Sequence, residues 1–117
     1  MIRSFNGKTS KTAESAFISE AAYVIGDVEI GENSSIWPGA IIKGDFGKIK
    51  IGWNTAIEDN CVIYSGSLSS PPISDVTIGD NVTIGHRAVS NGFRIGKNVM
   101  VSIKSVIPTM LKLATIL

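Results

Sequence analysis

The chain has 117 residues, of which 44% are hydrophobic and 18% are charged, and its formal net charge is +1. This length favours one domain over two, and the composition excludes a largely disordered chain. The nearly neutral charge gives no reason to expect nucleic acid or a membrane surface as a partner.

Cysteine content and the N-terminal segment bear on the cellular compartment. Cys61 is the only cysteine, which excludes a disulfide framework and a cysteine-rich zinc site. Residues 1–7 lack the apolar region of a secretory signal. No stretch reaches the roughly 20 apolar residues that a membrane helix needs. We therefore expect a cytoplasmic protein.

Aliphatic residues recur every six positions along most of the chain. The first series has no gap: Ile18, Val24, Ile30, Ile36 and Ile42. The period resumes after residues 43–50 and again after residues 65–75, and it slips by one residue before Val89. The later members are Ile51, Ile57, Ile63, Ile78, Ile84, Val89, Ile95, Val101 and Ile107. A period of six fits neither a helix nor a long alternating strand, so it predicts short strands joined by tight corners.

A second series supports the same arrangement. Small or slim residues follow the aliphatic residues at a distance of four: Ala22, Val28, Ser34, Ala40, Thr55, Cys61, Val82 and Ala88. Glycine and asparagine recur between the strands, where tight turns need them. Three strands make a triangular turn of about 18 residues, and stacked turns pair as parallel strands about 4.8 Å apart. The sequence thus predicts an all-β prism of four to five turns. Cys61 is expected to be structural, at a slim inward position.

The predicted domain covers residues 1–117. Its repeats run from about residue 13 to residue 107, with protruding loops at residues 43–50 and 65–75. Residues 108–117 leave the repeat and are expected to form a short apolar cap, and we expect the C-terminal end of the prism to be truncated. Such a cap would cover the edge of the last turn.

Two segments carry a more specific pattern. They read IIKGDFGKIKIGWNTAIEDNCVIY and VTIGDNVTIGHRAVSNGFRIG. In order and spacing they resemble the γ-class carbonic anhydrases, over roughly residues 10–107. That family reads Arg-Gly-Asp, a Gln/Glu-Asp pair, a histidine, and then Gly-His with a third histidine five residues later. The resemblance implies a left-handed parallel β-helix of hexapeptide repeats.

The resemblance also implies a zinc site shared between subunits. The family binds zinc through three histidines from two neighbouring subunits of a homotrimer, and the zinc-bound hydroxide converts carbon dioxide to bicarbonate. The three metal positions fall here on Tyr64, His86 and Asn91, and only His86 is a histidine. A neutral phenol and a carboxamide are poor zinc ligands. We therefore expect little bound zinc and impaired or absent hydration of carbon dioxide.

The other family positions receive roles in the same way. Glu58 occupies the catalytic position that orients water, and Asp59 completes the acidic pair. Lys43 stands in place of the family arginine and is expected to pair with Asp45 at the subunit interface, where Asp59 also lies. His86 is expected to be an interface histidine.

Trp37 and Trp53 lie on or beside repeat positions and are expected to pack between subunits.

Three functions remain open at this point. The first is a carbonic-anhydrase-like enzyme with a degenerate zinc site. The second is a non-catalytic trimeric assembly or binding module. The third is a hexapeptide-repeat acyltransferase that uses acetyl-coenzyme A and a histidine base. Metal content distinguishes the first two, and coenzyme A binding tests the third.

Overall fold

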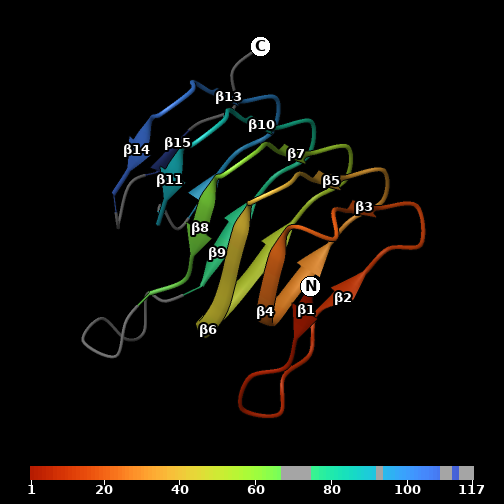
Figure 1. The fold of residues 1–117 in the computed structure, drawn as a ribbon. Helices are drawn as coiled ribbons and strands as arrows, with labels where there is room; N and C mark the ends of the chain where they lie inside the picture. The colour runs from red at the N-terminus through yellow and green to blue at the C-terminus, as the bar shows by residue number, and fades with distance from the viewer. Residues whose placement is uncertain (67–74, 92–93, 109–111, 114–117) are drawn as a thin grey trace.

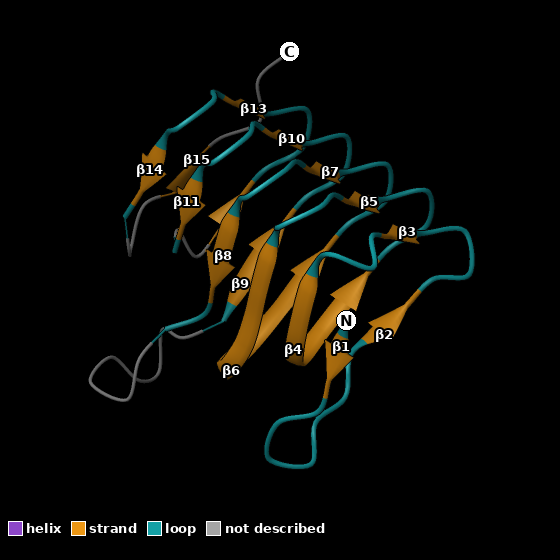
Figure 2. Ribbon diagram, viewed as in Figure 1, coloured by secondary structure: helices purple, strands orange, loops and turns teal. Residues whose placement is uncertain are grey.

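The computed structural model describes residues 1–66, 75–91, 94–108 and 112–113. Within these residues every regular element is a β-strand (Figure 2). The strands are β1 (Ile2–Arg3), β2 (Lys11–Thr12), β3 (Phe17–Ile18), β4 (Tyr23–Ile30), β5 (Ser35–Ile36), β6 (Ile41–Ile51), β7 (Ala56–Ile57), β8 (Val62–Tyr64), β9 (Val76–Ile78), β10 (Thr83–Ile84), β11 (Val89–Ser90), β12 (Arg94–Ile95), β13 (Met100–Val101), β14 (Val106–Ile107) and β15 (Lys112–Leu113). The described part of the chain has no helix that could span a membrane.

The strands form the three sides of a prism (Figure 1). Side 1 contains β1, the first parts of β4 and β6, and then β8, β11 and β14. Side 2 contains β2, the second parts of β4 and β6, and then β9, β12 and β15. Side 3 contains β3, β5, β7, β10 and β13. All these strand pairs are parallel, as expected when each turn stacks on the one before it.

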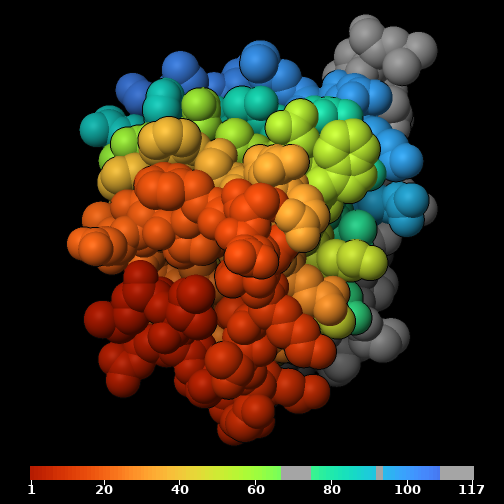
Figure 3. Space-filling view, turned by 90° about the vertical axis from the view of Figure 1, so that its right-hand side faces the viewer, coloured from red at the N-terminus to blue at the C-terminus, as the bar shows by residue number. Residues whose placement is uncertain are grey.

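The number of turns agrees with the prediction from the repeat. Five strands stack on side 3, which corresponds to about five turns. Figure 3 shows the same stacking from the side, as bands of colour that run from red at the N-terminal end to blue at the other. The predicted all-β fold of stacked triangular turns is confirmed.

Both repeat series point into the prism. The aliphatic positions that form the main column are at most 5% exposed: Val24, Ile30, Ile36, Ile42, Ile51, Ile57, Ile63, Ile78, Ile84, Ile95, Val101 and Ile107. The slim positions predicted to be inward are at most 2% exposed: Ala22, Val28, Ser34, Ala40, Thr55, Cys61, Val82 and Ala88. Residues between these two series face outward because side chains alternate along a strand. One six-residue period therefore supplies two inward residues per strand.

The position of the slip in the repeat was predicted wrongly. Val89 was expected to point inward, but Ser90 is the fully buried residue. Ser90 pairs with Ile63 on one side and with Ile107 on the other, so the period from Ile84 continues unbroken to a serine. The slip lies between Ser90 and Ile95. The search for an aliphatic residue missed it because a hydroxyl occupies this core position.

Residues 43–50 were predicted to form a loop, and this was wrong, because they lie within the continuous strand β6. The pairing of β4 with β6 jumps from Gly26–Gly44 to Val28–Ile49. The extra residues are thus taken up as an irregularity in the strand where it bends from side 1 to side 2. The loop predicted at residues 65–75 lies mostly outside the described residues.

The predicted limits of the repeat were also too narrow at both ends. Strands β1 and β2 pair with β4 and extend the prism before residue 13. Within the predicted cap, β15 pairs in parallel with β12 and continues side 2. The aliphatic period is weak at both ends of this chain. The short strands there are therefore hard to detect from the sequence.

Asparagine forms the corners between sides 2 and 3. The residues Asn33, Asn54, Asn81 and Asn98 all have φ between 53° and 58°, a conformation that asparagine tolerates better than most residues. Their backbone N–H groups from Asn54 onward donate to the preceding turn at 2.8–3.1 Å. The Asn54 amide also donates to Asn81 Oδ1 at 2.6 Å.

Glycine serves the same purpose at a corner between sides 3 and 1. Gly39 has φ 78°, and a Cβ there would collide with the side chain of Asn60 on the next turn.

Truncation of the inward column should destabilise the prism strongly. Ile57→Ala or Ile84→Ala is expected to lower the free energy of unfolding by about 2–5 kcal/mol, because each removes buried methyl groups and leaves a cavity. Chemical denaturation measures this loss. The control is Thr77→Glu on the outer face, where Thr77 is exposed and lies between Lys50 and Arg94. Equal losses for inward and outward variants would contradict the register described above.

Candidate functional site

The residues predicted to form the site lie at the two edges of side 1. Glu58 and Asp59 follow β7, and His86 follows β10. These three residues occupy the corner between sides 3 and 1. Tyr64 ends β8 and Asn91 follows β11, so both lie at the opposite edge, where side 1 turns toward side 2.

Two carboxylates flank the His86 imidazole. Its Nδ1 lies 3.6 Å from Asp59 Oδ1, and its Nε2 lies 3.9 Å from Glu58 Oε1. The His86 side chain is 48% exposed and those of Glu58 and Asp59 are 32% and 43% exposed. The resemblance therefore selected three residues that the fold does bring together. Because the corner is open to solvent, the contacts contribute little to stability.

The opposite edge carries a row of polar side chains. Lys43 of β6 is in register with Tyr64 of β8. Asn91 comes directly after Ser90, which is in register with Ile63, so Asn91 lies beside Tyr64 on the next turn. The Lys43 Nζ atom is 3.7 Å from Asp45 Oδ2, and this predicted ion pair is present. Its role at a subunit interface stays a prediction, as does that of Asp59.

The residues at the three metal positions do not fit a zinc ion. His86 and Asn91 lie at opposite ends of β11, so one chain does not bring the three positions to one point. Among the described residues of a single chain, no group of three His, Cys, Asp or Glu side chains is arranged to hold a metal ion. A second subunit could bring the two edges together. Each joined site would then contain only one imidazole, one phenol and one carboxamide at the metal positions. Zinc prefers imidazole, thiolate and carboxylate ligands.

An apolar row along side 1 was missed by the sequence reasoning. The outward residues of its strands are in register from turn to turn: Tyr23, Ile41, Val62, Val89 and Val106. The first four are half-buried and Val106 is 72% exposed. The outward row of side 2 is instead polar and mainly charged: Lys11, Glu29, Lys50, Thr77 and Arg94. The signal was present in the sequence as an apolar residue just before each inward position of side 1.

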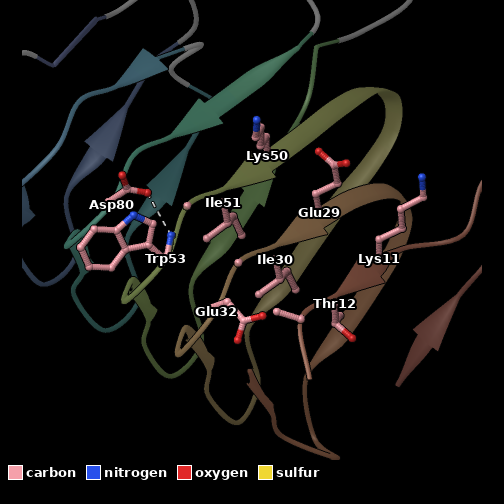
Figure 4. Close-up of a pocket in the computed structure, with 12 residues that line it drawn as sticks. Lys11, Thr12, Glu29, Ile30, Glu32, Lys50, Ile51, Trp53 and Asp80 are labelled. Atoms are coloured by element: carbon pink, nitrogen blue, oxygen red, sulfur yellow. Dashed lines mark hydrogen bonds between the residues drawn. The ribbon is translucent and has the colours of Figure 1, made fainter. Parts of the chain in front are cut away.

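A hollow of about 590 Å³ lies on side 2 and was also not predicted (Figure 4). Gly31 and Gly52 contribute to its lining, and a Cβ on either would collide with atoms of the next turn. Trp53 is 51% exposed and lines this hollow, and its backbone N–H donates to Asp80 Oδ1 at 3.0 Å. Side chains of both signs line the hollow, among them Glu29 and Lys50, so its electrostatics do not select one class of ligand.

The second tryptophan has a partner within the chain. Trp37 packs against Phe17 with their ring centroids 5.1 Å apart, and its indole N–H donates to Ser35 Oγ at 2.9 Å. Trp37 is 40% exposed. Packing of either tryptophan between subunits stays a prediction.

Cys61 is a buried structural residue. It is fully buried, in line with Ala40 and Ala88 of the neighbouring turns. Its thiol donates to the Gly85 carbonyl at 3.0 Å. Burial raises the pKa of the Cys61 thiol, and backbone hydrogen bonds oppose this effect in part.

The comparisons with known proteins agree with this fold and these motifs. A family profile described as the hexapeptide repeat of succinyl-transferase matches residues 75–102. A carbonic anhydrase of Geobacillus kaustophilus is 36% identical over 107 residues, which cover 92% of this chain and 56% of that protein. A probable carbonic anhydrase of Methanocaldococcus jannaschii is 46% identical over 90 residues, which cover 77% of this chain and 54% of that protein.

The solved structures give the same result for the fold. A putative acetyltransferase of Bacillus cereus superposes with a TM-score of 0.78 at 26% identity, covering 97% of this chain and 74% of that protein. The chain is therefore a hexapeptide-repeat β-solenoid protein. Within that class it is a homologue of the γ-class carbonic anhydrases, as its motifs predicted. The chain spans little more than half the length of the two carbonic anhydrases compared here.

The Cys61 thiol should react slowly while the chain is folded. At pH 8 its raised pKa lowers the thiolate fraction, and burial blocks access. Alkylation by iodoacetamide, followed by mass spectrometry, should be at least about tenfold slower in buffer than in denaturant. Rapid alkylation of the folded protein would show that the Cys61 thiol is accessible to solvent, which would contradict its burial.

Proposed function

We propose that this chain is a γ-class carbonic anhydrase homologue that acts as a trimeric assembly or binding module and does not hydrate carbon dioxide through a zinc ion of its own. The observation that supports the proposal is the donor set at the metal positions. Tyr64 and Asn91 replace two imidazoles, and only His86 is left. One imidazole per chain does not make a catalytic zinc site, which needs three protein ligands and an open position.

The arrangement of side 1 supports a role in assembly. Its apolar row of Tyr23, Ile41, Val62, Val89 and Val106 runs across five turns, whereas the corresponding row of side 2 is mainly charged. A continuous apolar face on a small domain indicates a protein interface. The γ-class relationship supports three-fold symmetry. With side 1 at the interface, the edge with His86 and the edge with Tyr64 and Asn91 both lie close to neighbouring subunits.

Zinc binding tests the proposed function directly. The wild-type chain should bind zinc weakly, whereas Tyr64→His with Asn91→His should bind it stoichiometrically, because three imidazoles are then available at the family positions. Metal analysis after dialysis measures the difference, and a carbon dioxide hydration assay follows any regained activity. His86→Ala in the double variant should abolish the gain. Tight zinc binding or hydration activity in the wild type would overturn the proposal.

Disruption of the apolar row should dissociate the trimer. Val62→Glu places a charge in the middle of that row, where burial against another subunit would leave it unpaired. Sedimentation velocity at micromolar concentration should show a trimer for the wild type and smaller species for the variant. Thr77→Glu on side 2 is the matched control and should remain trimeric. A monomeric wild type, or dissociation of the control alone, would contradict the proposed interface.

A further inference from the structure

The hollow on side 2 is formed by the ends of three stacked strands. Strands β2, β4 and β6 end beside it, and the residues after each strand turn the chain toward side 3. Its volume of about 590 Å³ falls within the range of about 300–1,000 Å³ that is typical of small-molecule sites. Figure 4 shows Trp53 and Asp80 on one side of the hollow and Lys11 and Glu29 on the other. The hollow therefore has the size and the enclosing side chains that a small ligand needs.

Trp53 is the unusual residue of this hollow. The Asn54 N–H donates to the Glu32 carbonyl at 2.8 Å and the Asn81 N–H donates to the Trp53 carbonyl at 3.1 Å. Glu32, Trp53 and Asp80 thus occupy the same corner position on successive turns. The indole is 51% exposed between two acidic residues. Among the described residues it stacks on no other aromatic ring, and its N–H has no hydrogen-bond partner. The contacts of the described residues give no structural reason for an indole here.

The two carboxylates next to the indole are held in place by the chain. The Asn33 N–H donates to Ser15 Oγ at 2.9 Å, and the Ser15 hydroxyl donates to the Glu32 carboxylate. On the other side, Asp80 Oδ1 accepts the backbone N–H of Trp53 at 3.0 Å. A carboxylate has about four acceptor sites. Both groups therefore keep lone pairs that can accept hydrogen bonds from a ligand.

The charges around the hollow nearly cancel. Three carboxylates and two ammonium groups line it: Glu29, Glu32, Asp80, Lys11 and Lys50. The Glu29 carboxylate lies 3.2 Å from the Nζ atom of Lys48, which does not line the hollow and balances the third negative charge. An anion would be repelled by the carboxylates, and a cation by the ammonium groups. A neutral ligand whose groups both donate and accept hydrogen bonds avoids both repulsions.

We infer that the hollow binds a neutral saccharide, with one pyranose ring against Trp53. The C–H groups of such a ring form an apolar face, which suits the electron-rich face of an indole. Its hydroxyls both donate and accept, so they can donate to the carboxylates of Glu32 and Asp80 and accept from the ammonium of Lys50. Side 1 contributes no residue to the lining, and the inference does not depend on the proposed function.

An NMR titration of the full chain labelled with 15N tests the inference. The probes are the methyl β-glycosides of glucose, galactose and mannose, which differ in the orientation of their hydroxyls. At least one should shift the indole N–H signal of Trp53 until it saturates, together with the backbone amides of Gly31 and Gly52. The indole signal of Trp37 should stay in place.

Two further probes separate the aromatic contact from the hydrogen bonds. Glycerol has hydroxyls but no ring, and nicotinamide has a flat ring but no hydroxyls. Each should bind at least about tenfold more weakly than the best glycoside, because each makes only one of the two kinds of contact.

Variants of the lining give the matched comparison, with the Gly31 amide as the signal. Trp53→Ala should weaken glycoside binding at least about tenfold, whereas Trp53→Phe should keep part of the affinity because an aromatic ring remains. Glu32→Gln removes a charged acceptor at nearly constant shape and should weaken binding roughly tenfold. Trp37→Phe changes a tryptophan outside the hollow and should leave the affinity unchanged. Circular dichroism confirms that each variant is folded.

Each outcome decides for or against the saccharide site. Saturable shifts that Trp53→Ala and Glu32→Gln weaken, and that Trp37→Phe does not, support the inference. No saturation with any of the three glycosides, or nicotinamide binding as tight as that of the best glycoside, would overturn it. Equal losses in Trp53→Ala and Trp37→Phe would overturn it too. Zinc analysis and sedimentation decide the proposed function separately, so the two can fail independently.

Discussion

The fold depends on the stacking of equivalent residues from turn to turn. Each inward aliphatic side chain packs on its counterpart one turn away, and the backbone groups of each strand pair with the strands before and after it. Neither condition holds unless the corresponding corners of successive turns bend the chain in the same way. The asparagines with positive φ meet that requirement between sides 2 and 3. The core and the corners are thus two parts of one geometrical constraint.

This constraint explains which parts of the fold could be predicted from the sequence. A period of six is long and regular, so chance does not imitate it, and it led to the prism, its number of turns and both inward series. The failures occurred where the period carries no aliphatic residue. Ser90 was missed because it fills a core position with a hydroxyl, and strand β6 was read as a loop because its extra residues break the count. Where the period carries no aliphatic residue, only the hydrogen-bonded register of the strands shows which residues of neighbouring turns lie side by side.

The candidate site was less predictable because it lies on outward positions, which the repeat does not restrict. The resemblance to the γ-class carbonic anhydrases brought His86, Glu58 and Asp59 into one group, and the distances of 3.6 and 3.9 Å agree with it. No pattern within the chain would have selected these residues. The apolar row of side 1 was visible as an apolar residue before each inward position, but only the register shows that these residues form one continuous face.

The separation of core and surface also explains how the metal positions can change without loss of the fold. Tyr64 and Asn91 follow inward residues at the ends of their strands, so neither is one of the stacked aliphatic residues. A substitution there alters the chemistry of one edge while the stacking below it stays intact. His86 lies at the other edge of the same side, so neither edge has a complete set of ligands. For this fold, the stacked inward residues hold the turns together, whereas the outward residues at the edges of side 1 set the chemistry there.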